Sequence, residues 1–441
     1  SAVLNNFTII TGGPGTGKTT TVAKILSILF QINPDLKVAL AAPTGKAASR
    51  MDESLKIAAE KENEIIQTKF QTLQPFTIHR LLGWQKNSIY FKHNSDNTLN
   101  YDVVIVDEAS MIDVALFAKL LSAIGAKTKL IVLGDKNQLT SVEAGSLFGD
   151  LCQAQISLNI FSEERVTLIN SFIENKSQQI PDAAISISPH PLFQHVIELQ
   201  KSYRFSDDKG IGKFSKAVIK NDEESIKEFF KNTDEQILID TKYSASIFQK
   251  FIDAYKEYIE EKDLSKAFKK LNQLKVLVAV REGEQGLYAI NKEIERYLIE
   301  RKYIKYDQEF YENRPVMVTS NNYELNLFNG DIGIIRRDEN GIIKIWFENN
   351  GQIQGISPFL ISKVETVFAM TVHKSQGSEF NKILIVLPKN ENIKILTREL
   401  LYTAISRAKE RVIIQGSEAT ILQTSKEIVK RGSGIIARFN Q

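Results

Sequence analysis

The first part of the chain alternates short, wholly apolar runs with longer segments whose apolar residues recur at a helical period. The apolar runs lie at Phe7–Ile10, Lys37–Ala41, Asp102–Val106 and Lys129–Leu133, and the clearest helical period covers Lys18–Phe30. Strands that are apolar at successive positions are typical of a parallel sheet covered by helices on both faces. The pattern therefore predicts one α/β domain over residues 1–195.

The same pattern returns in the second half of the chain. Apolar runs at Leu274–Val280, Asn381–Leu387 and Arg411–Gln415 predict strands, and Glu284–Glu300 and Thr397–Ala408 predict helices. Between them the chain changes to short β-rich pieces separated by Asn-Gly turns at 329–330, 340–341 and 350–351. We expect a second α/β domain built from residues 196–309 and 365–441, with a small antiparallel barrel inserted over residues 310–364.

Composition narrows the class of protein. The 441 residues include 43% hydrophobic and 25% charged side chains, which is ordinary for a globular chain and excludes a disordered or collagen-like one. No apolar run approaches the ~20 residues of a membrane span. With 56 Lys+Arg and 53 Asp+Glu, the net charge of +3 is too weak to indicate nucleic acid by itself.

Cysteine and histidine usage argues against disulfides and metal clusters. Cys152 is the only cysteine, so neither an internal disulfide nor a Cys-based zinc site can form, and the five histidines lack the spacing of metal ligands. We therefore expect a reducing, cytoplasmic setting. The chain opens Ser-Ala-Val, without a start methionine or a signal region, and enters a strand almost at once, so we also expect a segment upstream of it.

A phosphate-binding loop is the strongest motif. Residues 12–19 read GGPGTGKT and fit G-x-x-x-x-G-K-[ST] between a predicted strand and a predicted helix. Backbone N–H groups of such a turn face phosphate oxygens, Lys18 reaches the β- and γ-phosphates, and the Thr19 hydroxyl binds Mg²⁺. The motif predicts ATP or GTP binding by Gly12, Gly13, Pro14, Gly15, Thr16, Gly17, Lys18, Thr19 and Thr20.

Two later strands end in residues suited to hydrolysis. After the run at 102–106, Asp107 would hold Mg²⁺ and Glu108 would orient or deprotonate the attacking water. After the run at 129–133, Gln138 is placed to detect the γ-phosphate. Taken alone, the two acids also fit a helix start, and the segment around Gln138 also fits a plain turn. Together these motifs indicate an NTPase, and they leave a GTPase switch, a clamp-loader-type ATPase and a motor open.

Two arginines of the second domain are candidates for stabilising the transition state. Arg204 follows the strand-like Val196–Leu199, and Arg407 lies in a predicted helix. A permanently charged, forked side chain supplied by a facing domain suits phosphoryl transfer in motors. Each arginine alone is more often an ordinary surface residue, so the pattern by itself leaves both interpretations open.

Taken in order, the motifs resemble those of superfamily 1 helicases. They are GGPGTGKTT (12–20), AAPTGKAASRM (41–51), TIHRLLG (77–83), VDEASM (106–111), LGDKNQL (133–139), SYRF (202–205), AMTVHKSQGSEF (369–380) and YTAISRAK (402–409). The double glycine, PTGKAA, TIHRLLG, SVEAGSLFGDL (141–151) and NLFNGDIG (326–333) resemble the RecD family, the alpha subunit of exodeoxyribonuclease V (RecBCD). The resemblance spans nearly the whole chain and implies two RecA-like P-loop NTPase domains with an SH3-like barrel inserted in the second.

The resemblance also assigns roles in the nucleotide site. It keeps the roles given above for Lys18, Thr19, Asp107 and Glu108, makes Gln138 the γ-phosphate sensor, makes Arg204 and Arg407 arginine fingers, and places Gly377 and Glu379 against the nucleotide. It implies ATP rather than GTP and a cycle in which ATP closes and hydrolysis reopens a cleft between the two domains. The family reads adenine with a glutamine upstream of the phosphate loop, at a position before the first residue here.

DNA contacts are expected from polar loops that follow strands. Such loops lie at the sheet edge where ligands collect, and their hydroxyls, N–H groups and basic ends suit a phosphate backbone without reading bases. The candidates are Pro43, Thr44, Lys46, Thr77, His79 and Arg80 in the first domain and Thr371, His373, Lys374 and Ser375 in the second. His79 and His373 also fit structural histidines. Phe76 and Trp84 fit either base stacking or the core, and a hairpin with His93 fits a strand-separating pin.

The resemblance implies a 5′→3′ helicase that moves on single-stranded DNA and unwinds broken duplex ends with RecB-like and RecC-like partner subunits. In that family the nuclease resides in another subunit, and no nuclease-type metal cluster is seen in this sequence. Two other functions stay open. One is a nucleotide-gated subunit that clamps DNA or partners and does little unwinding alone, which is separated by whether ATP turnover depends on single-stranded DNA. The other is a stand-alone RecD-like helicase, which is separated by whether partner-subunit genes lie nearby.

Overall fold

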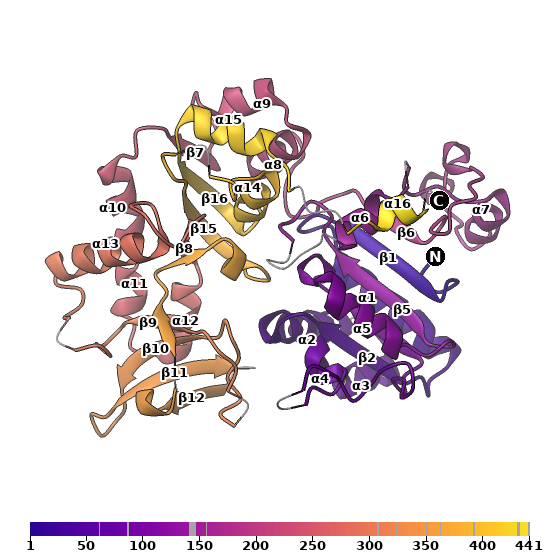
Figure 1. Ribbon diagram of the computed structural model, residues 1–441, viewed down its shortest axis with the longest axis horizontal. Coiled ribbons are helices and arrows are strands. Elements are labelled where there is room, and N and C mark those ends of the chain that lie inside the picture. The colour runs from indigo at the N-terminus through magenta and orange to yellow at the C-terminus, as the bar shows by residue number, and fades with distance from the viewer. Residues whose placement is uncertain are drawn as a thin grey trace. The chain divides into compact units, whose positions relative to one another are not determined.

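The computed structural model describes residues 1–60, 62–85, 88–140, 147–155, 157–306, 308–322, 324–349, 352–361, 363–390, 393–429 and 433–439 (Figure 1). The chain forms two compact units. Unit 1 comprises Ser1–Tyr203 and Lys430–Gln441, and unit 2 comprises Arg204–Val429. The first six residues of the motif at 141–151 and the predicted turn at 350–351 lie outside the described residues. No described helix is long and apolar enough to cross a membrane.

Unit 1 is built on a parallel sheet. Its described strands are β1 (Phe7–Gly12), β2 (Val38–Ala42), β3 (Pro75–Thr77), β4 (Val103–Val106), β5 (Lys129–Gly134) and β6 (Val196–Leu199). They lie in the order β3-β2-β4-β5-β1-β6, and every neighbouring pair is parallel. β1, β2, β4 and β5 lie where the apolar runs predict them, because successive β-branched residues favour extended backbone.

Alternate residues along these strands face opposite sides of the sheet. On β4, Val103 and Ile105 pack with α1 (Lys18–Ile32), α2 (Gly45–Ala59) and α3 (Glu64–Thr72). Val104 and Val106 pack on the other face with α4 (Ile78–Leu81), α5 (Val114–Ala123) and α6 (Leu147–Gln153). Since side chains alternate along a strand, only a run that is apolar throughout can bury both faces.

The other described helices of unit 1 include one from the far end of the sequence. They are α7 (Glu163–Asn170), α16 (Ile435–Phe439) and the 3-10 turns η1 (Ala109–Met111), η2 (Lys176–Gln178) and η3 (Asp182–Ala184). Ile435 and Phe439 of α16 pack against the apolar cluster that contains α6. Just before α16, the backbone N–H and Oγ of Ser433 donate to Asp150 of α6 at 2.5 and 2.6 Å.

The structure corrects the expected boundaries between the two domains. β6 pairs in parallel with β1, with Ile9 opposite Val196, so residues 196–203 belong to unit 1 rather than to the second domain. Residues 430–441 also belong to unit 1. Both segments are short, and their local pattern of apolar residues does not specify which of two similar parallel sheets they join.

Unit 2 contains a second parallel sheet. Its described strands are β7 (Ile237–Asp240), β8 (Leu274–Val278), β14 (Ala369–Thr371), β15 (Phe380–Val386) and β16 (Ala408–Gln415), in the order β14-β8-β15-β16-β7. The helices around it are α8 (Gly210–Lys220), α9 (Glu223–Phe229), α10 (Ala245–Asp253), α11 (Lys256–Ile259), α12 (Leu264–Leu271), α13 (Leu287–Glu300), α14 (Arg398–Ile405) and α15 (Glu418–Lys426), with a 3-10 turn η5 (His373–Ser375).

An antiparallel sheet interrupts this second parallel sheet in the sequence. It consists of β9 (Pro315–Val318), β10 (Ile332–Arg337), β11 (Ile343–Asn349), β12 (Gln352–Ile356) and β13 (Val364–Thr366), with a 3-10 turn η4 (Pro358–Leu360). Val316, Ile335 and Phe347 belong to its own apolar core. Figure 1 shows it in orange at the end of unit 2 opposite α9 and α15. Two parallel α/β units with an antiparallel insertion in the second confirm the predicted fold class.

Candidate active site

The glycine-rich turn between β1 and α1 folds around the Lys18 ammonium. Nζ donates to the carbonyls of Gly12 and Gly13 at 2.7 and 3.2 Å, and Thr16 Oγ1 donates to Gly13 at 2.8 Å. Gly17 precedes α1 with φ 83°, a left-handed conformation that glycine adopts without strain. Among the described residues no side chain caps α1, so its first N–H groups and the positive end of its dipole stay available to an anion.

The wall behind this loop comes from residues that the motif does not include. A Cβ on Gly12 would lie 2.6 Å from Thr16 Oγ1 and 3.0 Å from Leu199 Cβ, so only glycine fits there. Ser202 Oγ donates to the carbonyl of Pro14 at 3.2 Å, and the N–H of Tyr203 donates to that of Gly15 at 2.8 Å. Sequence reasoning singled out Arg204 of the SYRF motif and missed this support, because it depends on β6 pairing with β1.

The predicted acid pair leaves β4 beside the phosphate loop. The N–H of Asp107 donates to Ala41 at 2.9 Å, and the N–H of Glu108 donates to Asp107 Oδ1 at 2.8 Å. Glu108 has φ 53°, a left-handed conformation that costs a non-glycine residue about 1–3 kcal/mol and is typical of functional sites. Burial, and next the Glu108 charge, raise the pKa of Asp107 to about 6, whereas the Lys18 charge lowers it. Lys18 and the acid pair are therefore close enough to interact.

Gln138 is buried in the turn that follows β5. Its Nε2 donates to Asp135 Oδ2 at 3.2 Å, and its N–H donates to the Asp135 carbonyl at 3.2 Å. Its Oε1 is buried and accepts no hydrogen bond within the described part of the chain. A buried amide oxygen without a donor is unfavourable by about 1–3 kcal/mol, so Gln138 is poised to accept from a ligand or water.

The carboxyl edge of the unit 1 sheet collects the predicted residues in spatial order. From β3 to β1 the edge carries Thr77–Arg80, Pro43–Lys46, Asp107–Glu108, Asp135–Gln138 and the phosphate loop. β5 separates β1 from β4, so Gln138 follows the strand that lies between the phosphate loop and the acid pair. Ligands of open α/β sheets bind at this edge. The structure thus brings the nucleotide residues to one side of the edge and the DNA candidates to the other.

Thr44 and Thr77 cap the helices that open after β2 and β3. Thr44 Oγ1 accepts from the N–H of Ala47 at 3.2 Å, and Thr77 Oγ1 accepts from the N–H of Arg80 at 3.2 Å. Ala42 and Thr77 are register partners of β2 and β3, so the two caps lie on adjacent strands. Each cap oxygen accepts a helix N–H, which leaves the hydroxyl proton to donate to a phosphate oxygen.

The basic and aromatic candidates of this edge are exposed. His79 and Arg80 are exposed, with the His79 ring 5.7 Å from Phe91 and the Arg80 guanidinium 5.4 Å from the Phe76 ring. Trp84 and Phe91 form an antiparallel bridge, and His93 Nδ1 lies 3.2 Å from the Asn97 carbonyl. Trp84, Ile89 and Tyr90 are 46%, 76% and 73% exposed, so apolar surface faces solvent beside the predicted DNA contacts.

Unit 2 gathers its predicted nucleotide residues around one short segment. Arg204 Nη2 donates to Glu379 Oε1 at 2.6 Å. Arg407 is buried and donates to the carbonyls of Ser378 at 3.4 Å and Thr403 at 3.2 Å. Gly377 has φ 68° and turns the chain just before them. Arg204, Arg407, Gly377 and Glu379 thus meet within this unit.

The DNA candidates of unit 2 lie on the turn after β14. Thr371 Oγ1 accepts from the N–H of Lys374 at 3.3 Å, and Ser375 is fully buried with its hydroxyl donating to Val372 at 2.7 Å. Lys374 Nζ donates to Asn329 Oδ1 at 2.7 Å, and burial lowers its pKa. His373 is half-buried. Thr371 and Ser375 therefore shape the turn, whereas His373 and Lys374 retain surface.

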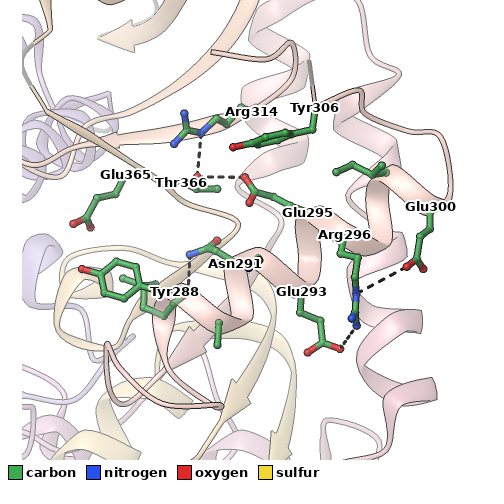
Figure 2. A pocket seen from close by; sticks show the side chains of 14 residues that line it. Tyr288, Asn291, Glu293, Glu295, Arg296, Glu300, Tyr306, Arg314, Glu365 and Thr366 are labelled. Carbon is green, nitrogen blue, oxygen red and sulfur yellow. Dashed lines mark hydrogen bonds and ion pairs between the residues drawn. The ribbon is translucent and has the colours of Figure 1, made fainter. Parts of the chain in front are cut away.

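A separate cavity of about 860 Å³ lies in unit 2 along α13 (Figure 2). Arg314 Nε donates to Thr366 Oγ1 at 3.0 Å, and Thr366 donates to Glu295 at 3.4 Å. Figure 2 also shows Arg296 between Glu293 and Glu300 on the same helix. None of the site residues predicted from the sequence is among the described residues that line this cavity.

A metal site of conventional type is absent from the described residues, where no group of three His, Cys, Asp or Glu side chains is placed to hold an ion. Thr19 and Asp107 instead offer a hydroxyl and a carboxylate beside the phosphate loop. Hard oxygen donors of this kind suit Mg²⁺, which usually keeps waters and takes only one or two protein ligands together with phosphates. A cation would also offset the burial that raises the pKa of Asp107, so the donor set fits.

Three family models match the chain. A model described as AAA domain matches residues 1–144, one described as UvrD-like helicase C-terminal domain matches residues 366–415, and one described as ATP-dependent RecD-like DNA helicase SH3 domain matches residues 290–347. With the phosphate loop and the acid pair, these matches define a superfamily 1 helicase ATPase.

Curated relatives specify the family. The RecBCD enzyme subunit RecD of Haemophilus influenzae is 34% identical over 467 residues, which cover 99% of this chain and 70% of that protein. The ATP-dependent RecD2 DNA helicase of Deinococcus radiodurans is 26% identical over 439 residues, which cover 99% of this chain and 50% of that protein. The chain therefore belongs to the RecD family, as its motifs predict. A Pif1 helicase structure from Bacteroides, in complex with ADP-AlF3 and ssDNA, matches at 15% identity with a TM-score of 0.44 and covers 99% of this chain and 94% of that one.

Proposed function

We propose that the chain is an ATP-dependent helicase and translocase that moves 5′→3′ on single-stranded DNA as the alpha subunit of an exodeoxyribonuclease V complex. The observation that carries the proposal is the phosphate loop closed around Lys18, with the Asp107–Glu108 pair within reach of the Lys18 charge. Membership of the RecD family supports RecB-like and RecC-like partner subunits, duplex DNA ends as substrate, and a role in double-strand break repair in the cytoplasm.

In the proposed ATP chemistry, the loop N–H groups and Lys18 bind the phosphates, and Glu108 orients and deprotonates the attacking water. Gln138 contacts that water or the γ-phosphate through its buried amide. Thr19 and Asp107 would hold Mg²⁺, which supplies charge neutralisation at the phosphate oxygens. The left-handed backbone of Glu108 supports this role, because such strain persists mainly where the surrounding structure fixes a residue for function.

Arg204 and Arg407 are the proposed arginine fingers. A guanidinium on the γ-phosphate stabilises the charge that develops during transfer and is worth about 10³–10⁵ in rate where it has been measured. Both arginines are held beside Ser378–Glu379 by side-chain and carbonyl contacts rather than exposed on a surface, which favours a site role over the surface alternative.

The proposed DNA path uses Thr44, Lys46, Thr77, His79 and Arg80 of unit 1, and His373 and Lys374 of unit 2. Hydroxyls and basic groups at the carboxyl edge of the sheet suit phosphates rather than base edges, so the contact is independent of sequence. An ATP-driven alternation of grip between the two sets would move the chain along a strand.

The test is the ATPase rate with and without single-stranded DNA, with Glu108→Gln as the blank and Glu64→Gln, an exposed acid in the first turn of α3, as the matched control. We expect strong stimulation by DNA that Glu108→Gln abolishes and Glu64→Gln retains. Duplexes with a 5′ or a 3′ overhang then test polarity, and only the 5′ overhang is expected to be unwound.

Two outcomes would redirect the proposal. Nucleotide binding without DNA-stimulated turnover would favour a nucleotide-gated subunit that clamps DNA or partners. Unwinding by the isolated chain that added RecB-like and RecC-like subunits do not change would favour a stand-alone helicase.

A further inference from the structure

Unit 2 holds one carboxylate between two cations. Glu379 Oε1 accepts from Arg204 Nη2 at 2.6 Å, and Glu379 Oε2 lies 3.3 Å from Lys409 Nζ. The Glu379, Arg204 and Lys409 side chains are 19%, 24% and 47% exposed. One negative charge thus meets two positive charges in partly desolvated surroundings, and the group as a whole carries excess positive charge.

A β-bulge brings Lys409 to this carboxylate. In the parallel pairing of β15 with β16, Phe380 lies opposite Ala408 and Lys382 lies opposite Arg411, so two steps along β15 face three steps along β16. The extra residue falls at Lys409–Glu410, where three successive side chains of β16 are exposed instead of alternating. Bulges re-aim side chains next to sites, and here the bulge places Lys409 beside the residue that precedes β15.

We propose that Lys409 is a positioning residue that neutralises Glu379 when Arg204 transfers from Glu379 to the γ-phosphate of bound ATP. The inference rests on the proposed function and adds to it a residue with no part in the chemistry described above. Lys409 acts through Glu379 and does not itself contact the phosphates.

The reason lies in the charges before and after the transfer. While Arg204 stays on Glu379, Lys409 competes for the same carboxylate and repels the guanidinium, which weakens the pair that ATP must break. After the transfer, Glu379 would face a triphosphate as an unpaired anion, and partly desolvated like charges repel strongly. Lysine suits this task because its flexible stem and compact charge can follow one carboxylate through both states.

The experiment is a double-mutant cycle on the full chain, saturated with single-stranded DNA. It compares wild type, Lys409→Met, Glu379→Gln and the double variant, with Lys409→Arg as the charge-retaining control. Two quantities are measured: kcat and KM for ATP, and the affinities for fluorescent ATP and ADP analogues, which require no turnover. Thermal unfolding of each variant reports folding.

Lys409→Met is expected to lower kcat about tenfold with KM changed less than about twofold, and to reduce the preference for ATP over ADP by a similar factor. In the Glu379→Gln background the same substitution should change neither quantity, and Lys409→Arg should restore most of both. A merely structural role would lower the melting temperature without this dependence on Glu379.

The failures are distinguishable. Equal losses from Lys409→Met with and without Glu379 would mean that Lys409 attracts the nucleotide directly, and no loss in wild type would mean that it has no role; either result overturns this inference alone. A wild-type chain that binds neither analogue would overturn the proposed function and this inference with it.

Discussion

The phosphate loop of unit 1 and the arginine cluster of unit 2 are built from different materials. The loop is made of backbone, because Lys18 is held by the carbonyls of Gly12 and Gly13, and a side chain at Gly12 has no room. The cluster is made of side chains, because Arg204 is held by the Glu379 carboxylate. Backbone contacts cannot be exchanged without unfolding a turn, whereas an ion pair can change partners. The first arrangement suits a permanent cradle and the second suits a switch.

The loop side of this comparison is tested most strongly at Lys18. Lys18→Gln is expected to lower the ATPase rate at least about 1,000-fold, since the amide cannot supply charge to the phosphates, with a melting temperature within about 3 °C of wild type. The measurement is steady-state hydrolysis with single-stranded DNA. Lys24→Gln, an exposed position on the same helix, is the matched control and should retain full activity. Substantial turnover by Lys18→Gln would move the ATP site elsewhere.

The cluster side is tested at Arg204 with its charge retained. Arg204→Lys should lower kcat at least about 100-fold, because lysine lacks the fork that bridges phosphate oxygens, while the affinity for ADP stays near that of wild type. Rapid-quench hydrolysis and ADP titration give the two values. Arg296→Lys, on a side chain that is 69% exposed, should change neither. A weaker affinity for ADP and ATP alike would show a ground-state contact instead of a finger.

Two glycines of the loop separate space from conformation. Gly12→Ala should lower the free energy of unfolding of unit 1 by about 1–3 kcal/mol, because the new Cβ would displace Thr16 and Leu199. At Gly17 no atom lies within 4 Å of the added carbon in the described structure, so Gly17→Ala meets only the left-handed backbone, at about 1 kcal/mol. Urea unfolding of both variants checks this order, and a larger loss at Gly17 would contradict it.

The smallest expected effect concerns the thiol on α6. Burial raises the pKa of Cys152 to about 12, from an ordinary value of 9.0. Since the folded pKa exceeds the unfolded one, this group adds no pH dependence to stability below about pH 9, and stability declines as the pH rises above it. Maleimide labelling at pH 8 should be slow in the native chain and fast in urea, with a single site because Cys152 is the only cysteine. Rapid native labelling would show that α6 opens readily.

The sequence reveals those parts of the site that depend on neighbouring residues in the chain. β1, the phosphate loop and α1 form one continuous segment, so Gly12, Lys18 and Thr19 are predicted together with their structural context. Asp107 and Gln138 are found for the same reason, since each directly follows an apolar run. Local patterns of this kind also give the two parallel sheets and the inserted antiparallel one.

The remaining features depend on pairings between distant segments. The run at 196–199 predicts a strand but does not indicate whether it joins β1 or the second sheet. Ser202 and Tyr203 become supports of the phosphate loop only through that pairing. Lys409 is one residue of a helicase motif until the bulge in β16 turns it toward Glu379. Such contacts follow from register, which the alternation of apolar residues does not specify across two similar sheets.

Unit 2 is, in sequence, an insertion within unit 1, and this has a consequence for synthesis. All described strands of the unit 1 sheet have been made by Leu199, but α16 is made only after Val429. The hydrogen bond from Ser433 to Asp150 therefore closes a loop of 283 residues, and contacts of such separation form late. Until then the α6 flank of a nascent unit 1 lacks Ile435 and Phe439, which makes it the expected place for chaperone contact during translation.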